Sequence, residues 1–146
     1  MTARQRLEVP PAVAAVCGLL VIIGALLPWY ATNLGEPFSP ETTTGWDATT
    51  AAKLALACGA LTAAAGAFSV LALRGRYRDP QILRFLGWMI VVTAGAAFAL
   101  IAFRALVKPD PAEFLSREIG IYVALAAAGF AVIAGVLQIL TRDPDS

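Results

Sequence analysis

Residues 119–140 read IGIYVALAAAGFAVIAGVLQIL and include no charged side chain. Crossing about 30 Å of hydrocarbon at 1.5 Å per residue requires roughly 20 apolar residues in a helix, because a helix satisfies its own backbone hydrogen bonds away from water. The segment therefore predicts a transmembrane helix. Gln138, near its end, is the most polar residue within it.

Three further apolar blocks precede this one, at 12–29, 51–73 and 85–103. Of the 146 residues, 59% are hydrophobic and 14% are charged, whereas about 25% are charged in soluble domains. The blocks and their short connections use up the length, so 1–146 is expected to be a single membrane domain. The predicted fold class is all-α, an antiparallel bundle of four transmembrane helices.

The basic residues indicate how the chain is oriented. If both termini lie on one side, that side carries seven of them, and the Arg74-Gly75-Arg76-Tyr77-Arg78 turn places three directly at helix ends. The other side carries four: Lys53, Arg104, Lys108 and Arg117. Because Lys and Arg concentrate in cytoplasmic flanks, both termini are expected to be cytoplasmic in a plasma-membrane protein. The first block lacks a small-x-small cleavage site, so it is expected to remain as a helix.

Four arginines on the cytoplasmic side lie where anionic headgroups are found: Arg74, Arg76, Arg78 and Arg84. Each basic residue near such a surface contributes about 1 kcal/mol of attraction. A topology signal is sufficient to explain them, and specific binding of lipid or protein is the alternative.

The longest polar connection, residues 30–50, is predicted to lie outside the cell. Its prolines and glycines exclude a long helix, and its aromatic rings suit the depth of lipid headgroups. The aromatic residues are Trp29, Tyr30, Phe38 and Trp46. We expect a short aromatic extracytoplasmic cap, which serves either as an ordinary interface belt or as a docking surface for a partner or a lipid.

Charged side chains are expected only near the ends of the spans. Lys53 and Arg104 can reach the headgroups or form an ion pair with Asp47 or Glu118, and Asp47 can also cap the second helix. Glu8 precedes the first apolar block. A proton-coupled antiporter needs a carboxylate inside the membrane, and on this interpretation the sequence offers none.

Several kinds of chemistry are excluded by composition. The chain has no histidine, which excludes His-ligated haem, Ser-His-Asp catalysis and common zinc sites. Cys17 and Cys58 are expected at depths that differ by roughly 10 Å, beyond disulfide reach, so both are interpreted as small apolar residues. A net charge of +1 gives no basic surplus for nucleic acid. We therefore predict no enzymatic activity, no cofactor, no metal and no nucleic-acid partner.

Small residues recur at the spacing of helix contacts. Gly59, Thr62, Gly66 and Ser69 fall on one helical face, and the fourth block carries a similar stripe of glycine and alanine. Such stripes let backbones approach closely, which drives helix association in lipid. They predict a compact bundle, and Gly59 and Gly66 are also candidates for contact with a partner helix.

Four short motifs resemble those of small four-helix membrane proteins of actinobacteria. They are Leu27-Pro28-Trp29, Gly45-Trp46-Asp47, the arginine-rich turn after the second block, and Gly120-Ile121-Tyr122-Val123-Ala124. The resemblance covers nearly the whole chain and implies a four-helix topology in the plasma membrane. It brings no activity and no catalytic residue.

Two functions remain open on these grounds. The first is a non-enzymatic accessory or scaffold protein that associates with a larger envelope or membrane complex through small-residue faces and the aromatic cap. The alternative is a small oligomeric transporter or lipid-handling protein, which would need a cavity of ligand size. The expected partners are accordingly membrane lipid and either a membrane protein or further copies of the chain.

Overall fold

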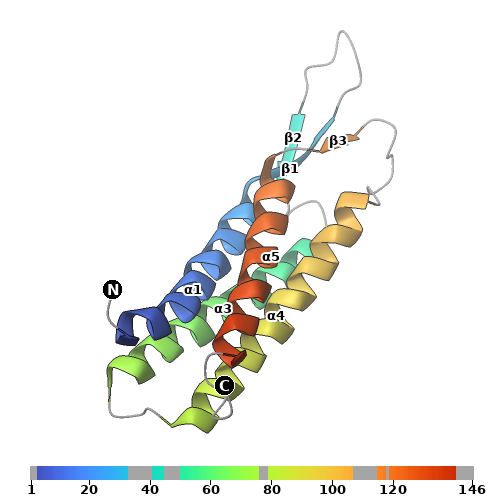
Figure 1. Cartoon of the computed structure of the whole chain (residues 1–146). Coiled ribbons are helices and arrows are strands. Elements are labelled where there is room, and N and C mark those ends of the chain that lie inside the picture. Colours follow the sequence, from blue (N-terminus) through green and yellow to red (C-terminus); the bar gives the residue numbers. More distant parts are fainter. Residues whose placement is uncertain are drawn as a thin grey trace.

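The computed structural model describes residues 3–32, 41–44, 50–75, 79–106, 115–117 and 119–140 (Figure 1). Its four helices are α1 (Ala3–Leu26), α3 (Thr50–Arg74), α4 (Pro80–Leu106) and α5 (Ile119–Leu140). Each is long and apolar enough to cross a membrane. The predicted bundle of four helices, each long and apolar enough to span a membrane, is confirmed.

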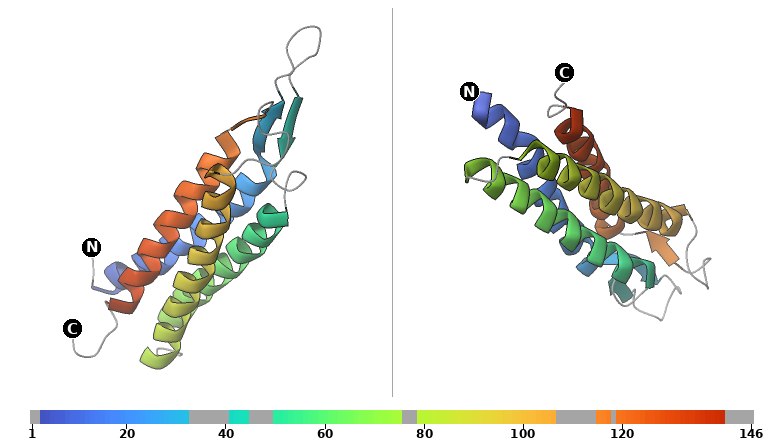
Figure 2. Two further views of the ribbon diagram at one scale, coloured as in Figure 1. Left: turned by 90° about the vertical axis from the view of Figure 1, so that its right-hand side faces the viewer. Right: turned by 90° about the horizontal axis from the view of Figure 1, so that it is seen from below.

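The helices alternate in direction and form a closed ring. In the ring α1 packs against α3 and α5, and α4 packs against the same two helices from the other side (Figures 1 and 2). Helix α1 begins and α5 ends at the same end of the bundle, which we call the terminal end (Figure 2). An even number of spans requires this arrangement.

At the opposite end, three short strands form a sheet that an all-α reading did not predict. They are β1 (Pro28–Thr32), β2 (Glu41–Thr44) and β3 (Leu115–Arg117), in the order β2-β1-β3. Both pairings are antiparallel, and Tyr30 lies opposite Thr43 on one side and Arg117 on the other. The sheet therefore ties the connection that follows α1 to the connection that precedes α5, and β1 and β2 project beyond the helices (Figure 1).

Two helices begin earlier than their apolar blocks suggest. The expected start of the first helix at Ala12 is wrong, because α1 continues toward the N-terminus through Pro10 and Pro11 to Ala3. Proline lacks an N–H, so two of the hydrogen bonds that a regular helix makes are missing at that point. Pro11 is fully buried, and its carbonyl lies where a side chain at Gly66 would be.

Helix α4 starts at Pro80 rather than at Phe85, where the apolar block begins. The residues just before the block form the first turn of the helix. The Asp79 carboxylate accepts a hydrogen bond from the Gln81 backbone N–H at 2.9 Å. Pro80 occupies the first helical position, where its missing N–H costs no hydrogen bond. The dipeptide Asp79-Pro80 is thus a helix-start signal that hydropathy alone overlooks.

Small side chains fill the inside of the bundle, whereas large apolar side chains cover the outside. The buried core consists largely of alanine, and Val21, Ile90, Ile101 and Ile121 are the largest aliphatic side chains that are fully buried in it. Exposed large side chains include Val92 and Phe130. Because lipid removes the hydrophobic drive between helices, close packing of small residues has to hold them together.

Glycine brings the backbones of α1 and α3 into direct contact. A Cβ added at Gly18 would lie 2.5 Å from the Ala63 nitrogen, and one added at Gly66 would lie 2.6 Å from the Pro11 carbonyl oxygen. Between α4 and α5, Gly87 and Gly135 instead make room mainly for side chains of the facing helix, those of Ile139 and Ile90. The expected role of the small stripes in packing is confirmed at Gly59 and Gly66. At Gly95 of α4, in contrast, an added Cβ meets nothing within 4 Å.

This difference predicts opposite effects of the same substitution. Gly66→Ala should destabilise the bundle by about 1–3 kcal/mol, because the new methyl group clashes with backbone atoms of α1, which can give way only if the helix shifts. Gly95→Ala should be neutral or stabilising by up to about 1 kcal/mol, because alanine favours the helix and the space is open. Unfolding of both variants in detergent would measure this, and equal effects would contradict the close contact at Gly66.

Candidate functional site

A buried polar group ties three of the helices together near the terminal end. Gln138 of α5 is fully buried, and its side-chain amide donates hydrogen bonds to the Ser69 hydroxyl of α3 and to the Leu83 carbonyl of α4, both at 3.0 Å. The Ser69 hydroxyl in turn donates to the Ala65 carbonyl at 2.8 Å. Each of the two N–H groups of the amide thus has its own acceptor.

A second polar contact joins α3 and α4 nearer the middle of the spans. The hydroxyl oxygens of Thr62 and Thr93 lie 2.7 Å apart. Each also lies near a carbonyl one turn earlier in its own helix, that of Cys58 for Thr62 and that of Met89 for Thr93. Since two hydroxyls have two protons between them, at most two of these three hydrogen bonds form at once. When one hydroxyl donates to the other across the helices, only the accepting hydroxyl can still donate to the carbonyl in its own helix.

Together, the two contacts place polar groups along α3 from the terminal end to mid-span. Thr62 and Ser69 are two helical turns apart on the same face. Their partners are hydroxyl, amide and backbone groups. These neutral groups hold helices in register and carry no charge. This arrangement fits a structural tie better than a path for ions.

Glu8 lies inside α1, so the expectation that it precedes the first helix is wrong. It falls within the candidate span Gln5–Leu26. One of its carboxylate oxygens lies 3.3 Å from both Nε and Nη2 of Arg74, at the end of α3. The Glu8 side chain is 14% exposed and that of Arg74 is 64% exposed. A carboxylate thus does enter a membrane-spanning helix, at its terminal end and beside an arginine.

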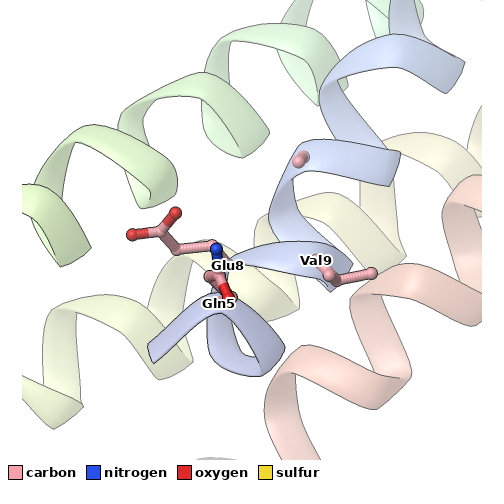
Figure 3. Close-up of a pocket in the computed structure, with 4 residues that line it drawn as sticks. Gln5, Glu8 and Val9 are labelled. Carbon is pink, nitrogen blue, oxygen red and sulfur yellow. The ribbon is translucent and has the colours of Figure 1, made fainter. Parts of the chain in front are cut away.

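An open hollow of about 510 Å³ lies beside this ion pair (Figure 3). It is lined by Gln5, Glu8, Val9 and Ala12. Glu8 extends toward α3, while Val9 points to the other side of α1 (Figure 3). The hollow combines a carboxylate and an amide with apolar side chains, which suits an amphipathic ligand better than a fully polar one.

A second hollow lies between α4 and α5, on the outside of the bundle. Its volume is about 390 Å³, and its lining is almost wholly apolar, with Phe98 on α4 and Tyr122, Gly129, Phe130 and Ile133 among its residues on α5. A Cβ added at Gly129 would lie 3.5 Å from the Phe98 ring. The missing side chain at Gly129 therefore deepens a groove that faces lipid.

The residues proposed from the sequence for partner binding are spread over different environments. Gly59 and Gly66 are buried where α3 packs on α1, which removes them from any surface offered to a partner. Trp29 and Tyr30 belong to β1, whose backbone alone is described. Phe38 and Trp46 lie outside the described residues, as do Asp47 and Glu118.

Of the four arginines predicted at headgroup depth, two can be placed. Arg74 ends α3 and is paired with Glu8, and Arg84 is exposed in the first turns of α4. Arg76 and Arg78 lie outside the described residues. Both placed arginines are at the terminal end of the bundle.

The cysteines and the metal-ligating residue types form no reactive group in the part of the chain that the structure describes. Cys17 is buried, Cys58 is half-buried, and both are free thiols, as the expected difference in depth requires. No group of three or more Cys, Asp or Glu side chains that could hold a metal occurs among the residues described.

Replacing Gln138 tests whether its amide holds the helices together. Gln138→Leu should destabilise the bundle by about 1–2 kcal/mol, because interhelical hydrogen bonds in membranes each contribute about 0.6–2 kcal/mol. Ser69→Ala should cost less, and the double variant should cost less than the two single changes combined, because they share one bond. Additive effects in detergent unfolding would show that the two side chains are not coupled.

Comparison with known proteins assigns no family to the chain. No protein-family model matches it, and no curated protein matches it.

Proposed function

We propose that the protein is a non-enzymatic integral membrane protein of the plasma membrane that acts as an accessory or scaffold subunit of a larger membrane complex. The observation that carries the proposal is the outward face of α4, where a close-packing surface faces away from the bundle. We assign this face as the binding surface for a transmembrane helix of the partner.

Four residues of α4 form an outward stripe at helical spacing: Trp88, Val92, Gly95 and Ala99. Val92 is 65% exposed and Trp88 is 51% exposed. Between these large side chains and the end of the helix, Gly95 and Ala99 form a Gly-x-x-x-Ala pair. Small residues four positions apart allow a second helix to approach closely.

The groove between α4 and α5 lies next to this stripe and supports the same proposal. Phe98, one turn beyond Gly95, forms one wall, and Phe130 lies on the other side. A side chain of a helix seated on Gly95 could enter the groove, as knobs enter holes in packed helices. The bundle's other close-packing glycines, such as Gly18 and Gly66, are used within the chain itself.

The sheet offers a second attachment point outside the bilayer. Because β1 pairs with both β2 and β3, the two outer connections move together as one unit. The unpaired edges of a small sheet are common sites for an added strand. We include an extracytoplasmic contact with the partner in the proposal, with Trp29, Tyr30, Phe38 and Trp46 as its candidate residues.

The proposal also includes cytoplasmic termini and an actinobacterial source. The concentration of arginine at the terminal end supports cytoplasmic termini by the positive-inside rule. The Pro28-Trp29 and Gly45-Trp46-Asp47 motifs support a source among the actinobacteria.

The second candidate function, a small oligomeric transporter or lipid-handling protein, is favoured by a different observation. The hollow beside Glu8 joins a nearly buried carboxylate to apolar walls within a membrane-spanning helix. Ionisable groups inside spans commonly mark ligand or ion sites. This hollow is separate from the outward stripe of α4, so the two functions can be tested independently.

The main proposal predicts that Gly95→Leu releases the partner without unfolding the bundle. The leucine would project from the docking surface into the partner, and we expect at least a tenfold loss of affinity, or about 1.4 kcal/mol. Ala67→Leu, at an exposed position on α3, is the matched control and should retain the partner. The measurement is co-purification of tagged protein at native levels in mild detergent, with mass spectrometry of the proteins retained.

Three outcomes of this experiment would contradict the proposal. A larger membrane protein that is retained equally by both variants would place the docking surface elsewhere. Loss of the partner in the Ala67→Leu control as well would show a general effect of added bulk. A wild-type protein that purifies only as copies of itself would contradict the accessory role.

A further inference from the structure

Two hollows of different polarity lie along the outward face of α1. At the terminal end, the hollow of about 510 Å³ is lined by Gln5, Glu8, Val9 and Ala12. Another hollow on α1, of about 260 Å³, is lined by Ala12, Val13, Val16 and Cys17 and is almost wholly apolar. Both hollows have Ala12 in their lining, so they adjoin along α1. We call the pair the α1 depression, which has Gln5 and Glu8 at one end and an almost wholly apolar lining at the other.

The length of this depression matches one leaflet of a bilayer. From Gln5 to Cys17 the helix rises about 18 Å at 1.5 Å per residue. Half of a hydrocarbon core of about 30 Å is about 15 Å. Because Gln5 is the first residue of the candidate span, the polar end lies at headgroup level and the apolar end near mid-membrane.

Glu8 lines the polar end, and Arg74 of α3 lies directly beside Glu8, so both signs of charge occur within a short distance. The Glu8 carboxylate and the Arg74 guanidinium are 3.3 Å apart, and Arg74 remains 64% exposed although it is paired. A headgroup that carries one phosphate and one ammonium has the same two charges in complementary form. Arginine binds phosphate oxygens well, and a carboxylate accepts strong hydrogen bonds from a primary ammonium.

We propose that this depression binds one phospholipid with a primary-ammonium headgroup, its ammonium at Glu8, its phosphate at Arg74 and an acyl chain along Val9, Val13 and Val16. A choline headgroup has no N–H to donate to Glu8, and a glycerol headgroup has no cation to balance it. The site therefore selects ethanolamine over both. This binding does not depend on helix docking at α4 and holds whether or not that proposal does.

Lipid titration followed by native mass spectrometry tests the assignment. Delipidated protein would be titrated with phosphatidylethanolamine, phosphatidylcholine and phosphatidylglycerol of identical acyl chains. We expect the wild type to bind phosphatidylethanolamine about tenfold more tightly than phosphatidylcholine, because one hydrogen bond to a charged group is gained. Glu8→Gln should reduce that preference to within about twofold.

Two further variants separate headgroup recognition from general attraction. Arg74→Gln should weaken binding of all three lipids, whereas Arg84→Gln, an exposed arginine at the same end, should leave binding unchanged. Ala12→Phe should block the junction of the two hollows and weaken all three lipids while leaving the headgroup preference intact. Thermal unfolding of each variant shows that the bundle is retained.

The assignment would be overturned by any of three results. A wild type that does not distinguish the three lipids has no headgroup site. A Glu8→Gln variant that keeps the full preference for ethanolamine excludes Glu8 as the ammonium ligand. Equal losses in Arg74→Gln and Arg84→Gln would indicate non-specific surface charge.

Discussion

The direct contact of the α1 and α3 backbones is the constraint on which the remaining packing depends. A single carbon atom added at Gly18 or Gly66 would lie 2.5–2.6 Å from backbone atoms of the other helix. In lipid, apolar surface alone does not hold helices together, so van der Waals contact between these closely packed backbones has to supply the attraction. With α1 held against α3, the other side of α1 packs on α5 at Gly24 and Ala124, and α4 closes the ring.

Polar side chains give this closely packed bundle a fixed register. Small residues permit several sliding positions, because one alanine resembles the next. Gln138 removes that freedom, since its amide reaches Ser69 and the Leu83 carbonyl only when α3, α4 and α5 are correctly aligned. The polar groups of the interior thus serve packing and register. The surfaces that we propose for function lie outside the interior: the stripe at Gly95, the hollow beside Glu8 and the sheet.

Hydropathy predicted the four spans because each crossing of the membrane needs an apolar run, and the bounds of 119–140 agree with α5. It failed where structure comes from single residues, as at Pro10 and Pro11 inside α1 and at Asp79-Pro80 before α4. The same error left Glu8 outside the first helix, whereas the structure places it inside α1 and beside Arg74. The partners of Gln138 are 55 and 69 residues away along the chain, and a single sequence carries no signal for such distances. The same holds for the pairing of β1 with β3 and for the outward direction of Gly95.

The central claim, that α1 and α3 touch through their backbones, is tested most directly by magic-angle-spinning NMR of isotope-labelled protein in lipid bilayers. The structure predicts through-space cross-peaks between the Gly18 and Ala63 backbone carbons and between those of Gly66 and Ala15. Absence of both, in spectra where sequential contacts within α1 and α3 are well resolved, would contradict the packing described here.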